Sequence, residues 1–410
     1  MNPPIACLLA ICSLVLVSCG GGGDDGGSGG TMNSTPPPPS TGNFVDSPVQ
    51  GLQYTASPSG LSGVTGPDGE FKYQSGDIVT FTIGGATIGS APAQPQITPF
   101  LGASIPSVLT DTPVNIAQLL LGLDTTPGSD RITLSATPPT LPPSTCIICS
   151  HFDTDMAAAG IPLASEADAI THLKRQFAIW GSWATAVSPN QLQVVTFMPD
   201  GVYMMADDDD PATVGGADGM ERGIYRWDPS TNILSYTVVV DTDGTGGLSK
   251  TSGIQSPPHT FVIDASGDSA TFRFGPNPAD QTIFTRVVDP TKQIVGAWRL
   301  AHLMFDPARE ILPFAVLTLL PDGTFMVSSD RFDSTPAGIE RGTYVSDEAS
   351  ETLTLTTTVD TNGEFGVNDS ATLPATLVVH ADTRSSINGE PSLTTSEGPD
   401  VVTFFRIKAP

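Results

Sequence analysis

This chain of 410 residues has few charged side chains, and most of those are acidic. Only 15% of its residues are Asp, Glu, Lys or Arg, whereas ordinary globular proteins have about 25%. Lys and Arg number 17 against 43 acidic residues, which gives a formal net charge of −26. Because such a surface repels phosphate groups, the composition argues against nucleic-acid binding and against a polybasic membrane contact. We expect a solvated acidic exterior, and divalent cations are the partner class that the charge favours.

Catalytic motifs are also scarce. The five histidines are scattered singly, and neither a His-Glu-x-x-His metal motif nor a P-loop occurs. The Gly-rich stretch at residues 20–30 lacks the flanking strand, the helix and the Lys of a phosphate cradle. The sequence therefore gives no catalytic residue, and we expect a protein that is not an enzyme.

The five cysteines include one close pair, Cys146 and Cys149, which are separated by two residues. In an oxidising compartment this spacing predicts a local disulfide. A thioredoxin-type redox site would need a βαβ context, and covalent haem would need His in place of Ser150. A zinc site would need further ligands, for which His151 and His172 are the candidates.

The N-terminus contains an apolar run, residues 5–17, that is too short for a permanent membrane helix. It ends in Leu16-Val17-Ser18-Cys19, which resembles the lipobox of bacterial lipoproteins. The resemblance implies a signal peptide over 1–18 and a lipid-modified Cys19 as the mature N-terminus. Gly20 replaces the Asp that retains such proteins in the inner membrane, which implies a lipid anchor in the outer membrane, on its periplasmic or cell-surface face. Residues 19–42 are rich in Gly and Pro and predict a disordered tether.

Residues 43–178 carry strand-like alternation and a Gly66-Pro67-Asp68-Gly69 turn before an alternating Phe/Tyr segment. The combination resembles the prealbumin-like modules of carboxypeptidase regulatory domains, which implies a β-sandwich. A longer similarity links the segment to uncharacterised proteobacterial lipoproteins and implies no known activity. One helix is expected near 113–123, with Thr112 as its N-cap. A second helix is expected over 165–178, with Ser165 as its N-cap.

The C-terminal half contains a tandem duplication. Gly219-Met220-Glu221-Arg222-Gly223-Ile224-Tyr225 returns as Gly338-Ile339-Glu340-Arg341-Gly342-Thr343-Tyr344, and Asp241-Thr242-Asp243-Gly244 returns as Asp360-Thr361-Asn362-Gly363. Each position lies 119 residues after its counterpart. We therefore predict two β-rich repeats over 180–290 and 295–410. Within each repeat we expect the adjacent Glu and Arg to form an ion pair where a strand begins.

The first repeat divides into eight candidate strands with short turns between them. Eight antiparallel strands can close into an up-and-down barrel, and an open sandwich is the alternative. The candidate strands cover 181–187, 192–198, 201–206, 222–227, 233–241, 259–264, 269–274 and 281–288.

The repeats share a further pattern: each opens with Gly-x-Trp, at Trp183 and Trp298, and each ends on a strand with a basic residue, Arg286 or Arg406. This pattern resembles the lipocalin-type (calycin) barrel, in which Trp and the basic side chain meet at the barrel floor. The resemblance implies a cation–π contact and a structural role for all four residues.

The turns at Asp241, Asp243, Asp360 and Asn362 are rich in oxygen and suggest calcium, although Asp-Gly turns also end many strands. No other cofactor is expected. The function that we expect is a non-catalytic binding, adhesive or structural role at the cell envelope, with an unknown protein or small-molecule partner. The alternative is a calycin-type carrier that holds a small apolar ligand inside each repeat.

Overall fold

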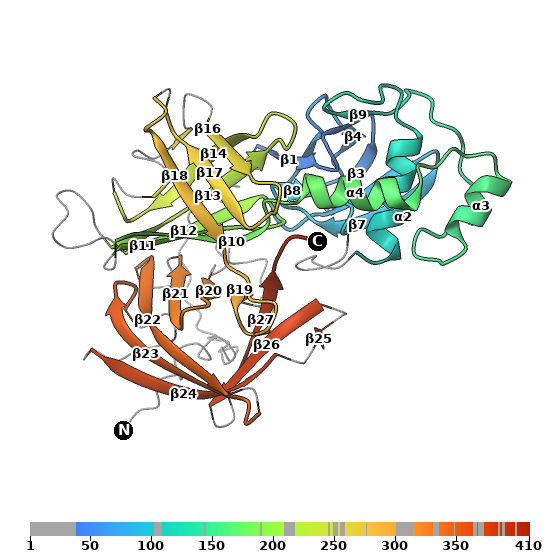
Figure 1. Cartoon of the computed structure of the whole chain (residues 1–410). Helices are drawn as coiled ribbons and strands as arrows, with labels where there is room; N and C mark the ends of the chain where they lie inside the picture. The colour runs from blue at the N-terminus through green and yellow to red at the C-terminus, as the bar shows by residue number, and fades with distance from the viewer. Residues whose placement is uncertain are drawn as a thin grey trace, which may run out of the picture.

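The computed structural model describes residues 38–101, 109–142, 145–188, 191–208, 218–244, 247–248, 253–254, 259–275, 277–300, 315–330, 336–347, 349–363, 367, 373–383, 386–387, 390–397 and 400–410. Within these residues the protein is mainly β, with three helices. Figure 1 shows an N-terminal domain beside a first barrel, and a second barrel packed against the first. The expected signal peptide, Cys19 and most of the tether lie outside the described residues.

Two small sheets and one strand pair form the N-terminal domain, in the orders β4-β3-β6-β7, β5-β1-β8 and β2-β9. The rings of Phe44 and Phe71 pack on Phe81, with centroids 4.7 and 5.5 Å away. Gly69 has a φ of 77°, and a Cβ there would lie 2.3 Å from the carbonyl oxygen of Phe44, so this turn requires glycine. The likeness to prealbumin-like modules stays a prediction. The strands are β1 (Ser40–Phe44), β2 (Val49–Gln50), β3 (Gln53–Ser57), β4 (Ser62–Val64), β5 (Glu70–Tyr73), β6 (Ile78–Ile83), β7 (Ala86–Pro92), β8 (Gln96–Ile97) and β9 (Ile132–Thr133).

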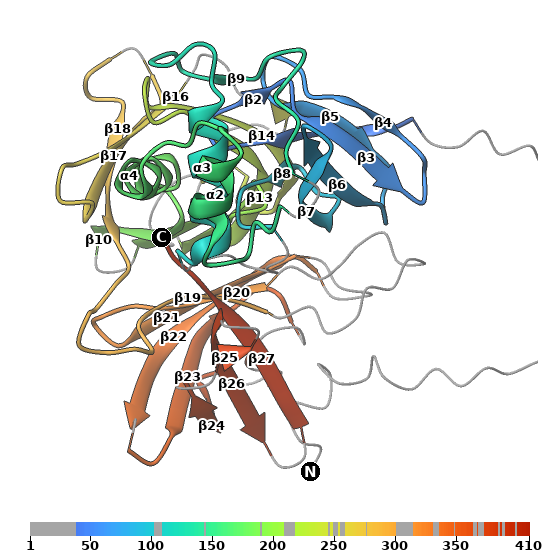
Figure 2. The same ribbon diagram turned by 90° about the vertical axis from the view of Figure 1, so that its right-hand side faces the viewer.

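The helices are α2 (Asp111–Gly122), α3 (Phe152–Ala158) and α4 (Glu166–Gln176). α2 begins two residues before the expected position, with Thr110 as its cap. α4 follows Ser165, whose hydroxyl accepts a hydrogen bond from the Asp168 amide at 3.1 Å. The sequence did not predict α3, because its seven residues are too few for a helical period and only Phe152 and Met156 are buried. Figure 2 shows α2 and α4 side by side, and both helices share a core with the first barrel.

Barrel 1 is a closed ring of eight antiparallel strands, in the order β10-β11-β12-β13-β14-β16-β17-β18 and back to β10. A two-residue strand, β15 (Gly253–Ile254), adds to β14. The barrel therefore confirms the closed alternative over the open sandwich, with strand bounds close to those expected. The strands are β10 (Gly181–Ser188), β11 (Gln191–Phe197), β12 (Val202–Asp208), β13 (Gly219–Trp227), β14 (Ile233–Asp241), β16 (His259–Ile263), β17 (Ser269–Arg273) and β18 (Gln281–Arg286).

Barrel 2 repeats this topology and closes through β19 and β27. Its ring contains eight strands, and the short β25 (Ser386–Ile387) pairs with β26 outside it. The longer loop expected near 305–310 lies outside the described residues. The strands are β19 (Gly296–Leu300), β20 (Ala315–Leu319), β21 (Thr324–Ser329), β22 (Gly338–Asp347), β23 (Thr352–Asp360), β24 (Ala375–Asp382), β26 (Glu390–Glu397) and β27 (Asp400–Ile407).

The two barrels pack through equivalent faces. Every residue of β12 is buried, because alternate side chains enter barrel 1 while Val202, Met204 and Ala206 join a core that continues into barrel 2. Two ion pairs cross the interface reciprocally. Arg222 of barrel 1 meets Asp330 at 2.7 Å, and its counterpart Arg341 meets Asp208 of barrel 1. Because each arginine reaches the other barrel from the same place in its own, the barrels are arranged like the subunits of a symmetric dimer.

These cross-barrel pairs correct one expectation from the sequence. Glu221 and Arg222 were expected to pair with each other, as were Glu340 and Arg341. Neighbouring residues of a strand point to opposite faces, so each Glu is buried in its own barrel while each Arg reaches the partner barrel.

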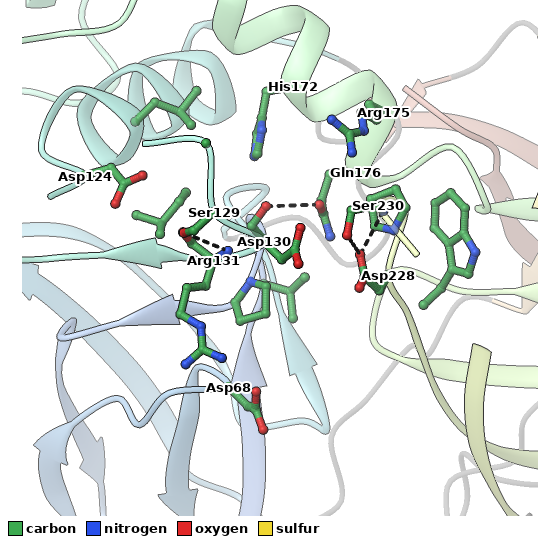
Figure 3. Close-up of a pocket in the computed structure, with 18 of the residues that line it drawn as sticks. Asp68, Asp124, Ser129, Asp130, Arg131, His172, Arg175, Gln176, Asp228 and Ser230 are labelled. Atoms are coloured by element: carbon green, nitrogen blue, oxygen red, sulfur yellow. Dashed lines mark hydrogen bonds between the residues drawn. The ribbon is translucent and has the colours of Figure 1, made fainter. Parts of the chain in front are cut away.

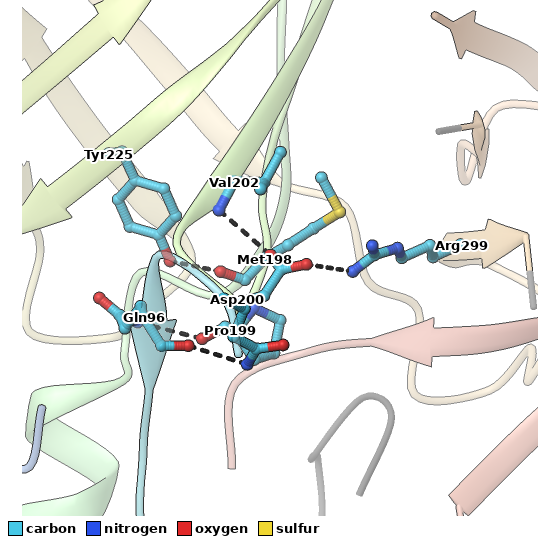
Figure 4. A network of polar contacts seen from close by, with 8 residues as sticks. Gln96, Met198, Pro199, Asp200, Val202, Tyr225 and Arg299 are labelled. Carbon is cyan, nitrogen blue, oxygen red and sulfur yellow. Dashed lines mark hydrogen bonds and ion pairs between the residues drawn. The ribbon is translucent and has the colours of Figure 1, made fainter. Parts of the chain in front are cut away.

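The N-terminal domain joins both barrels at the turn between β11 and β12, as Figure 4 shows. The side-chain amide of Gln96 donates to the carbonyl of Pro199 at 3.1 Å, and its backbone amide donates to the carbonyl of Asp200 at 3.0 Å. The Asp200 carboxylate accepts from the Val202 amide at 3.1 Å and pairs with Arg299 of barrel 2 at 2.5 Å. Asp200 therefore connects three parts of the chain, the N-terminal domain through its backbone carbonyl and the two barrels through its carboxylate.

Candidate functional site

A cleft of about 460 Å³ lies between the N-terminal domain and barrel 1. Figure 3 shows that His172, Arg175 and Gln176 face it from α4, with Arg131 on a segment of the N-terminal domain and Asp228 on the turn after β13. Its volume is in the range of small-molecule sites, and domain junctions are a common place for them. Its apolar wall consists of Val45, Pro48, Leu121, Pro127, Ile132, Trp227 and Pro229.

The register of α4 decides which side chains reach the cleft. Ala169 and Leu173 are fully buried and pack the helix into the core that it shares with barrel 1. His172, Arg175 and Gln176 are spaced at three and four residues, so they share a neighbouring face. The sequence predicted the helix but did not assign this face to a site.

His172 is held by Asp46, which is completely buried. Its Nε2 lies 2.9 Å from a carboxylate oxygen of Asp46 and 3.2 Å from the backbone carbonyl of the same residue. Burial alone would lower the pKa of His172 and Arg175 adds to that effect, but the charge and hydrogen bonds of Asp46 outweigh both and raise it. The imidazole therefore carries more positive charge near neutral pH than a free histidine does.

Two acids at the cleft are committed to local turns. Asp124 accepts hydrogen bonds from the amides of Thr126 and Thr133, at 3.0 and 2.9 Å. Asp228 accepts from the Ser230 amide at 2.8 Å and from the Thr231 hydroxyl at 2.7 Å. Partial burial would raise the pKa of Asp228, but these bonds outweigh it and lower the pKa. Both carboxylates therefore stabilise backbone turns.

The remaining charged side chains at the cleft differ in whether they have an ion-pair partner. Arg226 pairs with Asp68 at 3.4 Å, and both side chains are partly exposed. Arg131 and Arg175 form no ion pair with any residue in the described part of the chain, and neither does Asp130. Of the four carboxylates and three guanidinium groups that line the cleft, Asp130, Arg131 and Arg175 are thus the ones that neither a described ion pair nor a turn engages. The sequence did not assign any of these residues to a site.

The duplicated turns have a different environment from the cleft. In barrel 1, Asp243 is completely buried beside Glu221 and Asp207, which are also buried. A Cβ on Gly247 would lie 2.7 Å from an Asp243 oxygen and 3.0 Å from a Glu221 oxygen, and the Gly247 amide donates to Asp207 at 3.2 Å. Tyr203 donates to Glu221 at 2.5 Å. Burial, with the charges of Glu221, Asp241 and Asp207, raises the pKa of Asp243 to about 9. Asp243 is therefore protonated at neutral pH.

Barrel 2 places different chemistry at the same positions. Asn362 replaces Asp243, and Ser329 stands on β21 where Asp207 stands on β12, since each faces the glycine that begins the next strand. The Asn362 amide donates to the Ser329 hydroxyl at 2.8 Å and approaches Glu340 at 3.5 Å. Of these three equivalent positions, barrel 2 has a carboxylate only at Glu340, whereas barrel 1 has carboxylates at all three, Asp207, Glu221 and Asp243.

No group of three or more His, Cys, Asp or Glu side chains within the described ranges is arranged to hold a metal ion. Calcium at Asp241, Asp243, Asp360 and Asn362 stays a prediction.

Each barrel floor carries the Trp and Arg that the sequence singled out. The guanidinium carbon of Arg286 lies 4.0 Å from the ring centroid of Trp183, and that of Arg406 lies 4.7 Å from Trp298. Each Trp and Arg are direct partners across neighbouring strands. Burial lowers the pKa of both arginines to about 10, so both remain charged at neutral pH.

The same arginines fasten the segments that enter the barrels. Arg286 donates to the carbonyls of Ala178 and Trp180, at 2.6 and 2.9 Å, and Arg406 donates to those of Gln293 and Val295. These four contacts use the backbone carbonyls of the connecting chain. The arrangement is that of a structural floor.

Cys146 and Cys149 form a disulfide, with their Cα atoms 5.4 Å apart. The bond closes the loop before α3. His151 contacts Asp155 of the same helix at 2.7 Å, whereas His172 is at the cleft, so the structure does not bring the two histidines together with the cysteines.

Comparison of the chain with protein-family models, with curated proteins and with solved structures found no match. Among the helices of the described residues, none has the length and apolar character needed to cross a membrane.

Proposed function

We propose that this protein is a non-catalytic binding protein of the bacterial cell envelope, held at the outer membrane by a lipid on Cys19. The cleft between the N-terminal domain and barrel 1 is its binding site. The observation that carries this proposal is the cleft itself, which combines an apolar wall with guanidinium groups that have no described carboxylate partner. A chain with few basic residues has placed three arginines at this one opening.

The interior of barrel 1 supports the cleft over the barrel as the binding place. Phe261 lies in ring contact with Trp183 and Phe197, at centroid distances of 5.2 and 5.3 Å, and Phe197 contacts Tyr225 at 4.9 Å. These side chains are buried and occupy the space that a carrier would give to an apolar ligand. The alternative, a calycin-type carrier, therefore has less support than a site at the junction.

Native mass spectrometry tests this proposal. The mature chain, residues 19–410 with Cys19→Ala, is purified in soluble form, and we expect a small molecule to copurify with it. Asp130→Trp places a large side chain at the cleft, where Asp130 makes no described ion pair, and we expect it to remove the bound mass. Asp153→Trp, on the exposed side of α3, is the matched control and should retain it. A bound mass that survives Asp130→Trp would place the ligand elsewhere and refute the site.

A further inference from the structure

The charges at the cleft also indicate what kind of ligand it takes, an inference that rests on the proposed binding function. Among the acids that line the cleft, Asp124 and Asp228 are engaged by turn amides and Asp68 by Arg226. This leaves Arg131 and Arg175 against Asp130, with His172 adding charge as pH falls. The cleft has no net positive charge, because its four aspartates match or outnumber its three arginines and His172, but Arg131 and Arg175 have donors that no described carboxylate occupies.

The two arginines without a described ion pair are available to a ligand. Charges beyond about 8 Å are largely screened at physiological ionic strength, so a ligand inside the cleft responds mainly to the lining itself, where these two arginines are the available charged donors and Asp130 opposes them. Planar guanidinium groups bind carboxylate and phosphate through two parallel hydrogen bonds. Figure 3 shows Arg175 reaching toward the opening from α4 and Arg131 extending from the segment opposite it.

The rest of the lining is apolar. Leu121, Ile132 and Trp227 come from three different elements, and three prolines complete the wall. A ligand that satisfies both parts has an apolar body and one acidic group. Its volume must suit a cavity of about 460 Å³, which excludes a folded protein domain as the occupant.

We propose that the cleft binds a small organic acid, whose carboxylate or phosphate contacts Arg131 and Arg175 and whose apolar body packs against Trp227 and Ile132. Asp130 opposes this charge and sets an upper limit on the affinity. Hydrogen bonds to charged groups are each worth about 1.5–3 kcal/mol, which corresponds to at least about tenfold in the dissociation constant.

Isothermal titration of the mature Cys19→Ala chain, residues 19–410, with three probes tests the inference: phenylacetate, phenyl phosphate and the neutral phenylacetamide. We expect one or both acids to bind at least about tenfold more tightly than the amide, and the better acid identifies the acidic group. Arg131→Gln and Arg175→Gln should each weaken the better acid about tenfold and leave the amide unchanged. Asp130→Asn should strengthen the same acid, a change of the opposite sign that a folding defect does not produce.

Arg273→Gln provides the matched control, because it removes the same charge from an exposed position on β17 that does not line the cleft. It should leave all three affinities unchanged. Equal binding of acids and amide, no binding of any probe, or an equal loss in Arg273→Gln would overturn the inference. If a neutral molecule copurifies and Asp130→Trp removes it, the binding function stands and only its acidic specificity fails.

Discussion

Replacing Asp243 by Asn should stabilise barrel 1, and the gain should grow with pH. The folded protein holds the Asp243 proton until a pKa of about 9, while the usual value for aspartic acid, 3.8, applies to the unfolded chain. Unfolding therefore releases this proton at every pH between these values. The stabilising effect of the proton is fully present below about pH 4 and is lost as pH rises toward 9. An asparagine binds no proton in this pH range, so its contribution to the free energy of unfolding does not change with pH.

The change of the free energy of unfolding with pH follows from the number of protons released on unfolding. One proton released on unfolding changes the free energy of unfolding by about 1.4 kcal/mol per pH unit. Between pH 5 and pH 8 the difference between Asp243→Asn and the parent should therefore rise by up to about 4 kcal/mol. Asn362 shows that an amide fits this position, because it bonds Ser329 and approaches Glu340 in barrel 2.

Urea unfolding followed by tryptophan fluorescence measures this difference. Three of the four tryptophans, Trp180, Trp183 and Trp227, share the core of barrel 1, so the signal reports mainly on that barrel. The free energy of unfolding should be compared at pH 5, 6, 7 and 8. A gain that does not change with pH, or a variant less stable than the parent at pH 8, would refute the argument that Asp243 holds a proton.

Asn362→Asp is the reciprocal test in barrel 2. It places a second carboxylate beside Glu340, which is completely buried. We expect it to destabilise barrel 2 increasingly as pH rises, a change of opposite sign to that in barrel 1. Its fluorescence signal comes from Trp298.

Three further predictions concern the contact between the barrels at Asp200, the barrel floor at Arg286 and the lipid anchor at Cys19. Asp200→Asn should lower the free energy of unfolding by about 1–3 kcal/mol because it removes the charged acceptor that Arg299 contacts at 2.5 Å, whereas Asp322→Asn, at the equivalent exposed turn of barrel 2, should cost less than about 0.5 kcal/mol in the same urea titration. Arg286→Lys should cost about 2–4 kcal/mol, since one ammonium cannot reproduce the three backbone contacts of the guanidinium, and a thermal melt with an unchanged midpoint would contradict its structural role. Cys19→Ala should abolish incorporation of labelled palmitate in growing cells, and retained label would contradict the lipid anchor.

The sequence predicted the barrels well because their information is local. Alternation in β14, with Leu234, Tyr236 and Val238 buried and Ser235 exposed between them, is set by the two-residue period of a strand. The duplication then showed which residues recur in both repeats, and this identified the Trp and Arg at the floor of each barrel. Helix α3 was missed since two buried residues in one turn have no detectable period.

The interface between the barrels was not predicted, although a signal was present. Strands β12 and β20 carry almost continuous apolar residues, and every residue of both is buried. Such strands are covered on both faces, one by their own barrel and one by something else. The reciprocal pairs of Arg222 and Arg341 depend on how the barrels dock, and no pattern within one repeat specifies the partner of an arginine.

The cleft is harder to predict, because its residues come from segments that meet only after folding. The duplication nevertheless gives a way to find it. At positions where the fold alone determines the residue, the two repeats have the same residue, as with Trp183 and Trp298 at the barrel floors. At the end of β13 they differ: barrel 1 has Arg226 and Trp227 at the cleft, and the positions 119 residues later are Val345, which is 70% exposed, and Ser346.

A side chain that the fold requires should persist in both copies, so one that appears in a single copy needs a cause outside the fold. For Arg226 that cause is the N-terminal domain, whose Asp68 it pairs with, and Trp227 lines the cleft beside the same domain; within the described residues the N-terminal domain makes no such ion pair with barrel 2. The same comparison separates Asp243 from Asn362. Differences between the two barrels therefore mark two places where barrel 1 departs from the shared fold: the edge at Arg226 and Trp227, which lines the cleft, and the buried carboxylates around Asp243, which do not.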